Sequence, residues 1–134
     1  MKFLCLAYEE QRTFDTMSQP EWEAVRRETM DYVDKLRREG RLLDARPLRS
    51  ATTAATVRVR DGHVAVTDGP FAETKEQIGG YFLLEADSLD DAVRLAADWP
   101  GARLGTIEVR PVDEALRSDG RYATLAEGGA NVDG

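Results

Sequence analysis

The chain has little of the residue types from which metal sites and disulfides are built. It contains one cysteine and one histidine among 134 residues. A single cysteine cannot form an intrachain disulfide, and Cys5 lies in an apolar run, so we expect a buried thiol in a reducing, cytoplasmic setting. Because the sequence also has no CxxC motif, no HExxH motif and no glycine-rich phosphate loop, we expect neither a bound metal nor another cofactor.

Long apolar runs are missing as well. The run from Phe3 to Tyr8 is far shorter than the ~18 apolar residues of a membrane span, and nothing else approaches that length. Acidic residues outnumber basic ones by 25 to 18, which gives a net charge of −7. Because a negative surface repels phosphate backbones and anionic lipid, we expect no direct nucleic-acid partner and no membrane association.

The length permits one domain. Two domains would each fall below the usual ~100 to 150 residues and would bury too small a core. Regular hydrophobic patterns end near residue 112, and Gly, Asp, Asn and Ala dominate from Arg117 onward. The sequence therefore predicts a domain over residues 1–112 and a loosely ordered C-terminal extension over residues 113–134.

Hydrophobic periodicity and capping residues predict four strands and two helices. Ser18 with Glu21 forms a capping box ahead of an apolar stripe that includes Trp22, and Ser88 caps a second helix whose stripe includes Leu89 and Val93. The predicted helices cover residues 20–39 and 88–99, and the predicted strands cover residues 2–8, 41–48, 78–86 and 103–110.

A β-hairpin is predicted about the turn signal Asp61-Gly62. Pairing about this turn puts Arg60 opposite His63, Val59 opposite Val64 and Val57 opposite Val66. All four valines then share one face, which suits a hairpin with one buried side. His63 lies beside the turn and is interpreted as a solvated residue.

The order strand, helix, strand, hairpin, strand, helix, strand predicts an α+β fold. Two helices with this spacing cover only one face of the sheet. The other face carries Leu4 or Phe3, according to register, and Leu83, and the valine face of the hairpin also lacks a covering layer. Because exposed apolar faces are expected to find a partner, we predict a homodimer that packs sheet against sheet.

The segment from Asp68 to Tyr81 combines an acid, a turn, an aromatic and further charges. In a structural interpretation, Asp68 forms an Asx-turn, Phe71 fills the core, and Gly79-Gly80 lets another backbone approach closely. In a functional interpretation, Asp68 moves a proton at the mouth of a cleft, Lys75 attracts an anion, and Tyr81 donates a hydrogen bond or stacks. The residues alone do not decide between the structural and the functional interpretation.

Two further side chains have similar alternatives. Tyr8 ends the first strand, where it either binds a ligand through its hydroxyl group or packs in the core. Arg110 either holds a carboxylate ligand or forms an ion pair with Glu108, two residues away on the same strand face.

The segment from Asp68 to Tyr81 (Asp-Gly-Pro-Phe to Gly-Gly-Tyr) resembles the signature of DGPF-domain proteins within the YCII-related family. Further matches are Lys2 to Tyr8, Thr53 to Arg60 and Gly105 to Pro111, so the resemblance spans roughly residues 1 to 112. It implies a ferredoxin-like βαββαβ fold with an added hairpin, helices on one sheet face, a dimer of the α/β-barrel type, and a cleft on each subunit. Relatives include a dehydrochlorinase-type enzyme and resemble small cofactor-free isomerases.

The resemblance implies two alternative functions. In the first, a homodimer binds a small polar or anionic molecule and performs cofactor-free proton transfer. The second is a non-catalytic regulatory or interaction module, because genes of such proteins often lie near those of sigma factors. The wider family's active site is a His and Asp pair, but the predicted helix from Trp22 to Glu39 contains no histidine. The site expected here consists of Asp68 as the catalytic acid and of the ligand-binding residues Tyr8, Phe71, Lys75, Tyr81 and Arg110.

Overall fold

Strand β1 (Lys2–Glu9) lies at the centre of a four-stranded antiparallel sheet. The computed structural model describes residues 1–114, so the predicted extension over 113–134 lies outside the described residues apart from its first two. The strand order is β2-β5-β1-β6. The other three strands are β2 (Leu42–Pro47), β5 (Gln77–Glu85) and β6 (Thr106–Pro111). With one helix after β1 and one after β5, this is the predicted βαββαβ connectivity, and the α+β class is confirmed.

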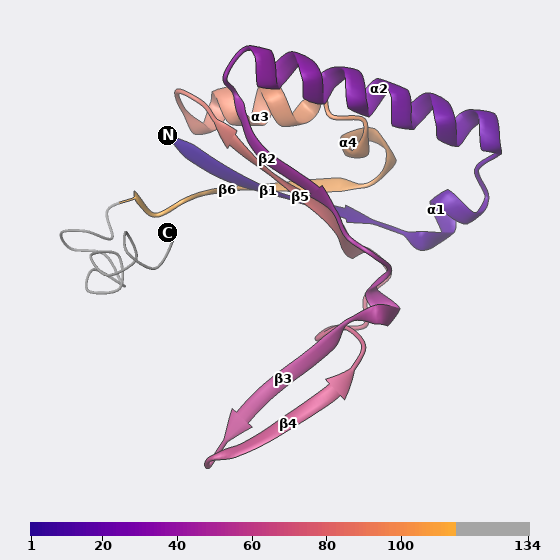
Figure 1. Cartoon of the computed structure of the whole chain (residues 1–134), viewed down its shortest axis with the longest axis vertical. Coiled ribbons are helices and arrows are strands. Elements are labelled where there is room, and N and C mark those ends of the chain that lie inside the picture. The colour runs from indigo at the N-terminus through magenta and orange to yellow at the C-terminus, as the bar shows by residue number, and fades with distance from the viewer. Residues whose placement is uncertain (115–134) are drawn as a thin grey trace.

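The two main helices, α2 (Gln19–Arg38) and α3 (Leu89–Ala97), lie on the same side of the sheet (Figure 1). The predicted caps are present: Ser18 and Glu21 form the reciprocal capping box of α2, and the Ser88 side chain accepts a hydrogen bond from the Asp91 backbone. Within residues 1–114, no helix combines the length and the apolar character needed to cross a membrane.

Three short elements were not predicted. They are helix α1 (Gln11–Asp15), the 3-10 turn η1 (Ala51–Thr53) and helix α4 (Gly101–Leu104). Pro100-Gly101, which was expected only to end a helix, also begins α4, so β6 starts at Thr106 instead of residue 103. Elements of three to five residues leave little hydrophobic periodicity, which explains why the pattern missed them.

The core fills the space between the sheet and the helices. Cys5 and Phe82 are almost completely buried and pack with Leu36 of α2 and Ala96 of α3. The ring of Phe82 stacks on that of Trp99 at 3.8 Å between centroids. Burial raises the pKa of the Cys5 thiol to about 12. Cys5 is therefore a small core side chain, as the strand-centre position predicted.

Part of each predicted helical stripe is exposed. Trp22 of α2 is 41% exposed, and Leu89 and Val93 of α3 are 46% and 47% exposed. The first half of α2 extends past the end of the sheet (Figure 1), and only its second half packs on the strands through Val33 and Leu36. The apolar stripe predicted for this helix is therefore only partly buried, because periodicity marks a face and not how far that face is covered.

Strands β3 (Ala55–Arg60) and β4 (His63–Asp68) form a separate two-stranded sheet, which we call the arm (residues 55–68). The predicted register is confirmed, with Val57 opposite Val66 and Val59 opposite Val64. Asp61 and Gly62 both have positive φ, as a tight hairpin turn requires. The four valines are 55–67% exposed, so no layer of the described chain buries this side of the arm.

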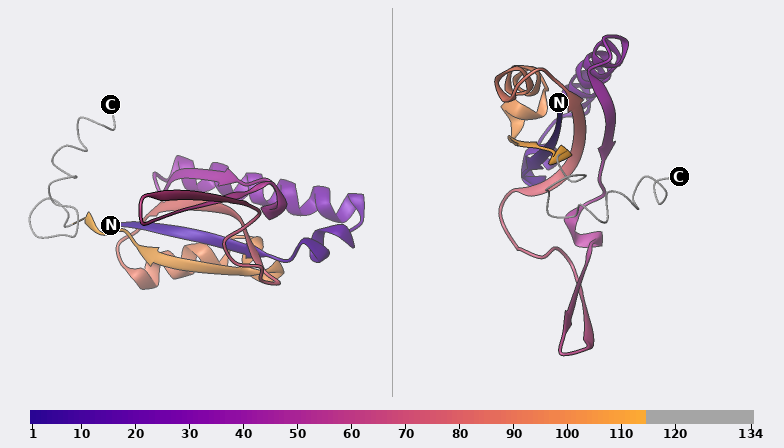
Figure 2. Two further views of the ribbon diagram at one scale, coloured as in Figure 1. Left: turned by 90° about the horizontal axis from the view of Figure 1, so that it is seen from below. Right: turned by 90° about the vertical axis from the view of Figure 1, so that its left-hand side faces the viewer.

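The sheet face turned away from the helices is the open face. Alternation along each strand sends Phe3, Cys5, Phe82 and Leu84 into the core and their neighbours to the other side. The open face consists of Leu4, Leu6 and Tyr8 of β1, Tyr81 and Leu83 of β5, Asp44 and Arg46 of β2, and Glu108 and Arg110 of β6. The arm projects from this side of the sheet (Figures 1 and 2).

Candidate functional site

One polar group of the open face joins β5 to the edge strand β2. The Tyr81 hydroxyl donates a hydrogen bond to Asp44 Oδ2 at 3.1 Å. Arg46 lies beside Tyr81 across the strands, and its Nε is 3.4 Å from Asp44 Oδ1. Because Asp44 and Arg46 are two residues apart on one strand, their side chains share a face. The result is a tyrosine, a carboxylate and an arginine at one edge of the sheet.

A second polar group of the same composition lies at the opposite edge. The Tyr8 hydroxyl donates a longer hydrogen bond to Glu108 Oε1 at 3.4 Å. The guanidinium of Arg110 pairs with the other oxygen of Glu108. Here the tyrosine comes from β1 and the acid and arginine come from β6, so each edge of the open face has the same three chemical groups.

Leucines separate the two polar groups. Leu4 pairs with Leu83 at the centre of the sheet, and Leu6 pairs with Tyr81. Four neighbouring strands place the edges about 14 Å apart. The open face is therefore a half-buried apolar strip with hydrogen-bonding groups on both sides, which suits a small flat molecule with polar substituents.

The arginines and carboxylates determine which chemical groups the open face can accommodate. The side chains of Arg46 and Arg110 are 69% and 67% exposed, so each keeps N–H groups for an anion besides its own ion pair. Asp44 and Glu108 accept hydrogen bonds from tyrosine hydroxyls, and a ligand hydroxyl can donate to the same oxygens. The arrangement is suited to a ligand that carries both acidic and hydroxyl groups.

The structure places Tyr8, Tyr81 and Arg110 on the open face, with Tyr8 and Arg110 in one polar group and Tyr81 in the other, and places the other three predicted residues elsewhere. Asp68 ends β4 at the foot of the arm, opposite Ala55, with an exposed side chain. Lys75 is 80% exposed and its Nζ lies 3.7 Å from Glu10 Oε1. The predicted site residues thus fall on the open face, at the foot of the arm and beside the end of β1.

Phe71 contradicts the structural interpretation of its segment. The side chain does not fill the core, because the residue is 75% exposed. The guanidinium of Arg58 lies over its ring at 5.4 Å from the centroid, a cation–π contact between the arm and the loop that follows it. Phe71 therefore lies against Arg58 of the arm and not in the core between the sheet and the helices.

The rest of the signature segment connects the arm to β5. The Gln77 amide donates to the carbonyls of Ala72 and Thr74, and the Thr56 hydroxyl donates to the carbonyl of Gly69 at 3.0 Å. A Cβ on Gly80 would meet the Arg46 carbonyl oxygen at 3.0 Å. The predicted close backbone approach is confirmed at Gly80, which lets β2 lie against β5.

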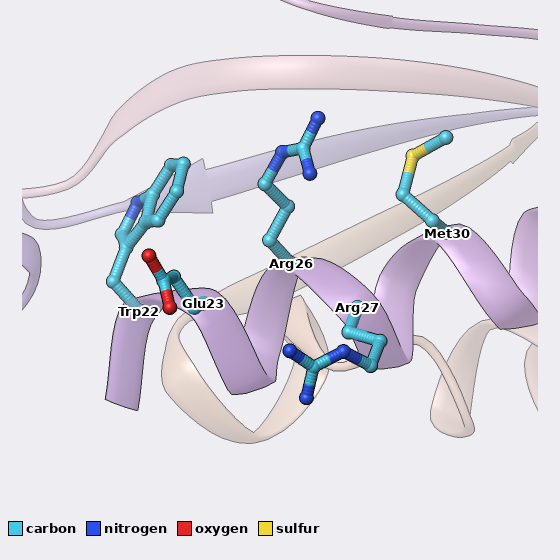
Figure 3. A pocket seen from close by; sticks show the side chains of 5 residues that line it. All are labelled: Trp22, Glu23, Arg26, Arg27 and Met30. Atoms are coloured by element: carbon cyan, nitrogen blue, oxygen red, sulfur yellow. The ribbon is translucent and has the colours of Figure 1, made fainter. Parts of the chain in front are cut away.

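Two hollows on the surface of the described residues are lined by none of the predicted site residues. One, of about 450 Å³, lies along the exposed first half of α2, where Trp22, Arg26 and Met30 point the same way at four-residue spacing (Figure 3). The other, of about 440 Å³, lies between α3, α4 and β6 and includes Val93 and Ile107. Both are on the helical side of the molecule.

Asp44 and Arg46 were missed as site residues. Their signal was present, since an acid and an arginine separated by one residue occur both at Asp44-Ala45-Arg46 and at Glu108-Val109-Arg110. Only the second pair was included in the prediction, because the strand over residues 41–48 was predicted without stating which of its residues lie on which sheet face. Within residues 1–114, no three His, Cys, Asp or Glu residues lie close enough together to hold a metal ion.

The fold and the open face define a small α+β protein with one sheet face free, and comparison with known proteins gives its family. The model of the YCII-related domain matches residues 1–116. An uncharacterised protein of Rhizobium meliloti (strain 1021) is 38% identical over 114 residues, which is 84% of this chain and 92% of that protein. The chain belongs to the YCII-related family.

A solved structure shares the fold. The 5-chloro-2-hydroxyhydroquinone dehydrochlorinase TftG of Burkholderia phenoliruptrix AC1100, in complex with 2,5-dihydroxybenzoquinone, superposes with a TM-score of 0.51. The similarity covers 89% of this chain and 100% of the dehydrochlorinase at 16% sequence identity. At this identity the likeness concerns the fold.

Proposed function

We propose that this protein binds a small, flat, polar or anionic molecule on the open face, between the two polar groups. The observation that carries the proposal is the repeated set of tyrosine, carboxylate and arginine at both edges of one apolar strip. An ordinary surface ion pair consists of an acid and a base, whereas here each carboxylate also accepts a hydrogen bond from a tyrosine hydroxyl. The ligand complex of the dehydrochlorinase, a hydroxylated quinone, supports this class of ligand.

A second copy of the chain is proposed to enclose the site. The open face has half-buried leucines and no covering layer within the described residues. Packing two such faces against each other excludes water from both strips and strengthens the electrostatic interactions of the edge groups. The assembly would be a homodimer through sheet faces, of the dimeric α/β-barrel type.

Proton transfer is the chemistry that we propose for the enclosed site. We assign the role of proton acceptor to Asp44 in place of Asp68. Asp44 accepts a hydrogen bond from the Tyr81 hydroxyl beside a guanidinium, so a ligand hydroxyl in the same place is positioned to lose its proton to the carboxylate. Asp68 has an exposed side chain at the foot of the arm and no such neighbours.

Calorimetric titration with 2,5-dihydroxybenzoquinone tests the binding site. We expect Tyr81→Phe and Arg46→Gln each to weaken binding by about tenfold, because each removes a hydrogen bond to a charged group or ligand. Arg37→Gln is the matched control, since Arg37 is an exposed arginine in the last turn of α2 on the helical side. Its affinity should equal that of the wild-type protein.

Two results would overturn the proposed function. If both open-face variants bind the quinone as tightly as the Arg37→Gln control, the ligand lies elsewhere. If the wild-type protein does not bind it at all, the ligand class is wrong. In that second case the regulatory or interaction module, with a sigma factor as its partner, becomes the better hypothesis.

A further inference from the structure

No layer among the described residues covers the valine face of the arm. Its two strands of six residues form a ribbon without a third strand, and an isolated two-stranded ribbon is only marginally stable in water. Val57, Val59, Val64 and Val66 occupy one face and are all more than half exposed. Such a ribbon with an uncovered valine face needs another surface to pack against.

The arm lies on the side of the molecule where a partner is proposed. It leaves the end of β2 and projects away from the helices, on the side of the open face (Figures 1 and 2). Six residues at the rise of a strand reach about 20 Å, whereas packed sheets are separated by about 10 Å. A copy seated on the open face therefore lies within reach of the arm.

Charge favours a second copy as this partner. The chain carries a net charge of −7, which opposes self-association in general. The arm is locally neutral, because Arg58 and Arg60 balance Asp61 and Asp68. The open face is neutral as well, because Asp44 and Glu108 are paired with Arg46 and Arg110, and Lys2 lies opposite Glu85. The two surfaces that would meet another copy are thus free of the repulsion expected of the whole chain.

We propose that the valine face of the arm packs against the second copy in the face-to-face dimer, so that each copy holds the other with its arm. This inference rests on the dimer in the proposed function and adds the contact that orders the arm. In a two-fold dimer each arm makes the same contact, so each valine is buried at two symmetry-related places in the dimer. The cation–π contact of Arg58 with Phe71 joins the arm to the loop that follows it in the same chain.

Lysine substitutions at two neighbouring positions test the arm. Val64 and Ala65 follow each other in β4 and lie on opposite faces of the arm, and both are exposed. In sedimentation at micromolar concentration, we expect Val64→Lys to raise the dimer dissociation constant at least about tenfold. The reason is that the substitution puts a charge in place of a buried valine in both copies of the dimer. Ala65→Lys should change it by less than about twofold. Circular dichroism should keep the signal of the folded domain in both variants, since neither residue touches the core. Tm should fall only in Val64→Lys, because dissociation removes the stabilisation that the partner supplies.

A third variant separates the arm from the sheet. Leu6→Lys places the charge on the open face, so the proposed dimer should dissociate in this variant too. If Leu6→Lys dissociates the dimer and Val64→Lys does not, the arm proposal is wrong and the face-to-face dimer stands. If only Val64→Lys dissociates it, the sheets do not meet and the face-to-face dimer is wrong. A monomeric wild-type protein would overturn both.

Hydrogen exchange of the arm gives an independent measurement. The arm amides that bond across β3 and β4 should exchange slowly in the dimer and rapidly in Val64→Lys, because a lone ribbon opens easily. In Ala65→Lys they should exchange as in the wild-type protein. Equal exchange rates in the Val64→Lys variant and the wild-type dimer would show that no partner covers the arm.

Discussion

The two faces of the four-stranded sheet are built from alternate residues of the same strands yet differ in every respect. In β5, Phe82 and Leu84 are at most 1% exposed beneath the helices, whereas Tyr81 and Leu83, which alternate with them, are only half-buried. The covered face is filled by side chains of α2 and α3. The open face has tyrosines, carboxylates and arginines around a leucine strip. One face stabilises the chain, and the other is available for recognition.

Charges show the same difference. On the covered side, Asp91 is 5% exposed and accepts hydrogen bonds from the Asp87 backbone, from Arg41 and from Arg94. On the open side, the ion pairs of Asp44 and Glu108 are accessible to solvent. A carboxylate with all its partners supplied by the fold is structural, whereas one with accessible partners can exchange them for a ligand.

Substitutions in neighbouring residues of β5 should give the largest contrast. Phe82→Ala removes a buried ring that stacks on Trp99, so we expect it to lower the free energy of unfolding by about 3–5 kcal/mol. Leu83→Ala should cost about 1 kcal/mol in the monomer, because Leu83 is only half-buried on the open face. Urea denaturation at a concentration below dimer formation measures both. Equal losses would contradict the distinction between the two faces.

The acid dependence of stability should also separate the faces. The Asp87 backbone N–H and then the Arg41 and Arg94 guanidinium groups hold the pKa of Asp91 below its usual range. A carboxyl group with a lowered pKa in the folded state contributes stability that is present above the pKa of the unfolded chain, about 3.9. This contribution is lost as the pH falls through the lower folded-state value.

Asp91→Asn should therefore lower Tm at pH 7, and the difference from the wild-type protein should shrink below about pH 4. Asp44→Asn, the control on the open face, should leave Tm nearly unchanged at either pH, because exposed ion pairs contribute ~0–1 kcal/mol. Thermal unfolding followed by circular dichroism across this range is the measurement. A loss in Asp91→Asn that does not depend on pH would exclude an ionised Asp91 as the cause.

The smallest contrast is expected between two tyrosine hydroxyls. The Tyr32 hydroxyl donates to the Leu95 carbonyl at 2.6 Å on the helical side, and burial raises the pKa of Tyr32 to about 12. Tyr32→Phe should cost about 1–2 kcal/mol, because it leaves that carbonyl without its partner. Tyr81→Phe should cost about 0.5 kcal/mol in unfolding but still weaken ligand binding. Chemical denaturation distinguishes them, and a larger loss in Tyr81→Phe would mean that the open-face group is structural.

Much of the fold could be predicted because its signals are local. The capping box at Ser18 and the turn Asp61-Gly62 each lie within a few residues, and both are confirmed. Alternation in β1 and β5 predicted which residues share a face. Counting two helices against one sheet predicted that a face would stay uncovered. Each of these inferences needed only the period of an element and the residues at its ends.

The errors came from long-range geometry. Trp22 has the helical spacing of a core residue, but the sheet ends before the helix does, and Trp22 stays 41% exposed. The structural interpretation put Phe71 in the core, and instead the residue is exposed with the guanidinium of Arg58 over its ring. Asp68 and Tyr81 are close in sequence, yet one lies at the foot of the arm and the other on the sheet. Sequence distance gave no measure of these separations.

The amino-acid sequence by itself determined the two main helices and the strands, the hairpin register, the buried cysteine and the existence of a free sheet face, because strand alternation, helix caps and turn residues act over a few positions. Only the tertiary structure decided what the free face contains. Asp44 meets Tyr81 across 37 residues, and Tyr8 meets Glu108 across 100. These contacts depend on which strands become neighbours, and that choice is made by packing of the whole sheet against its helices.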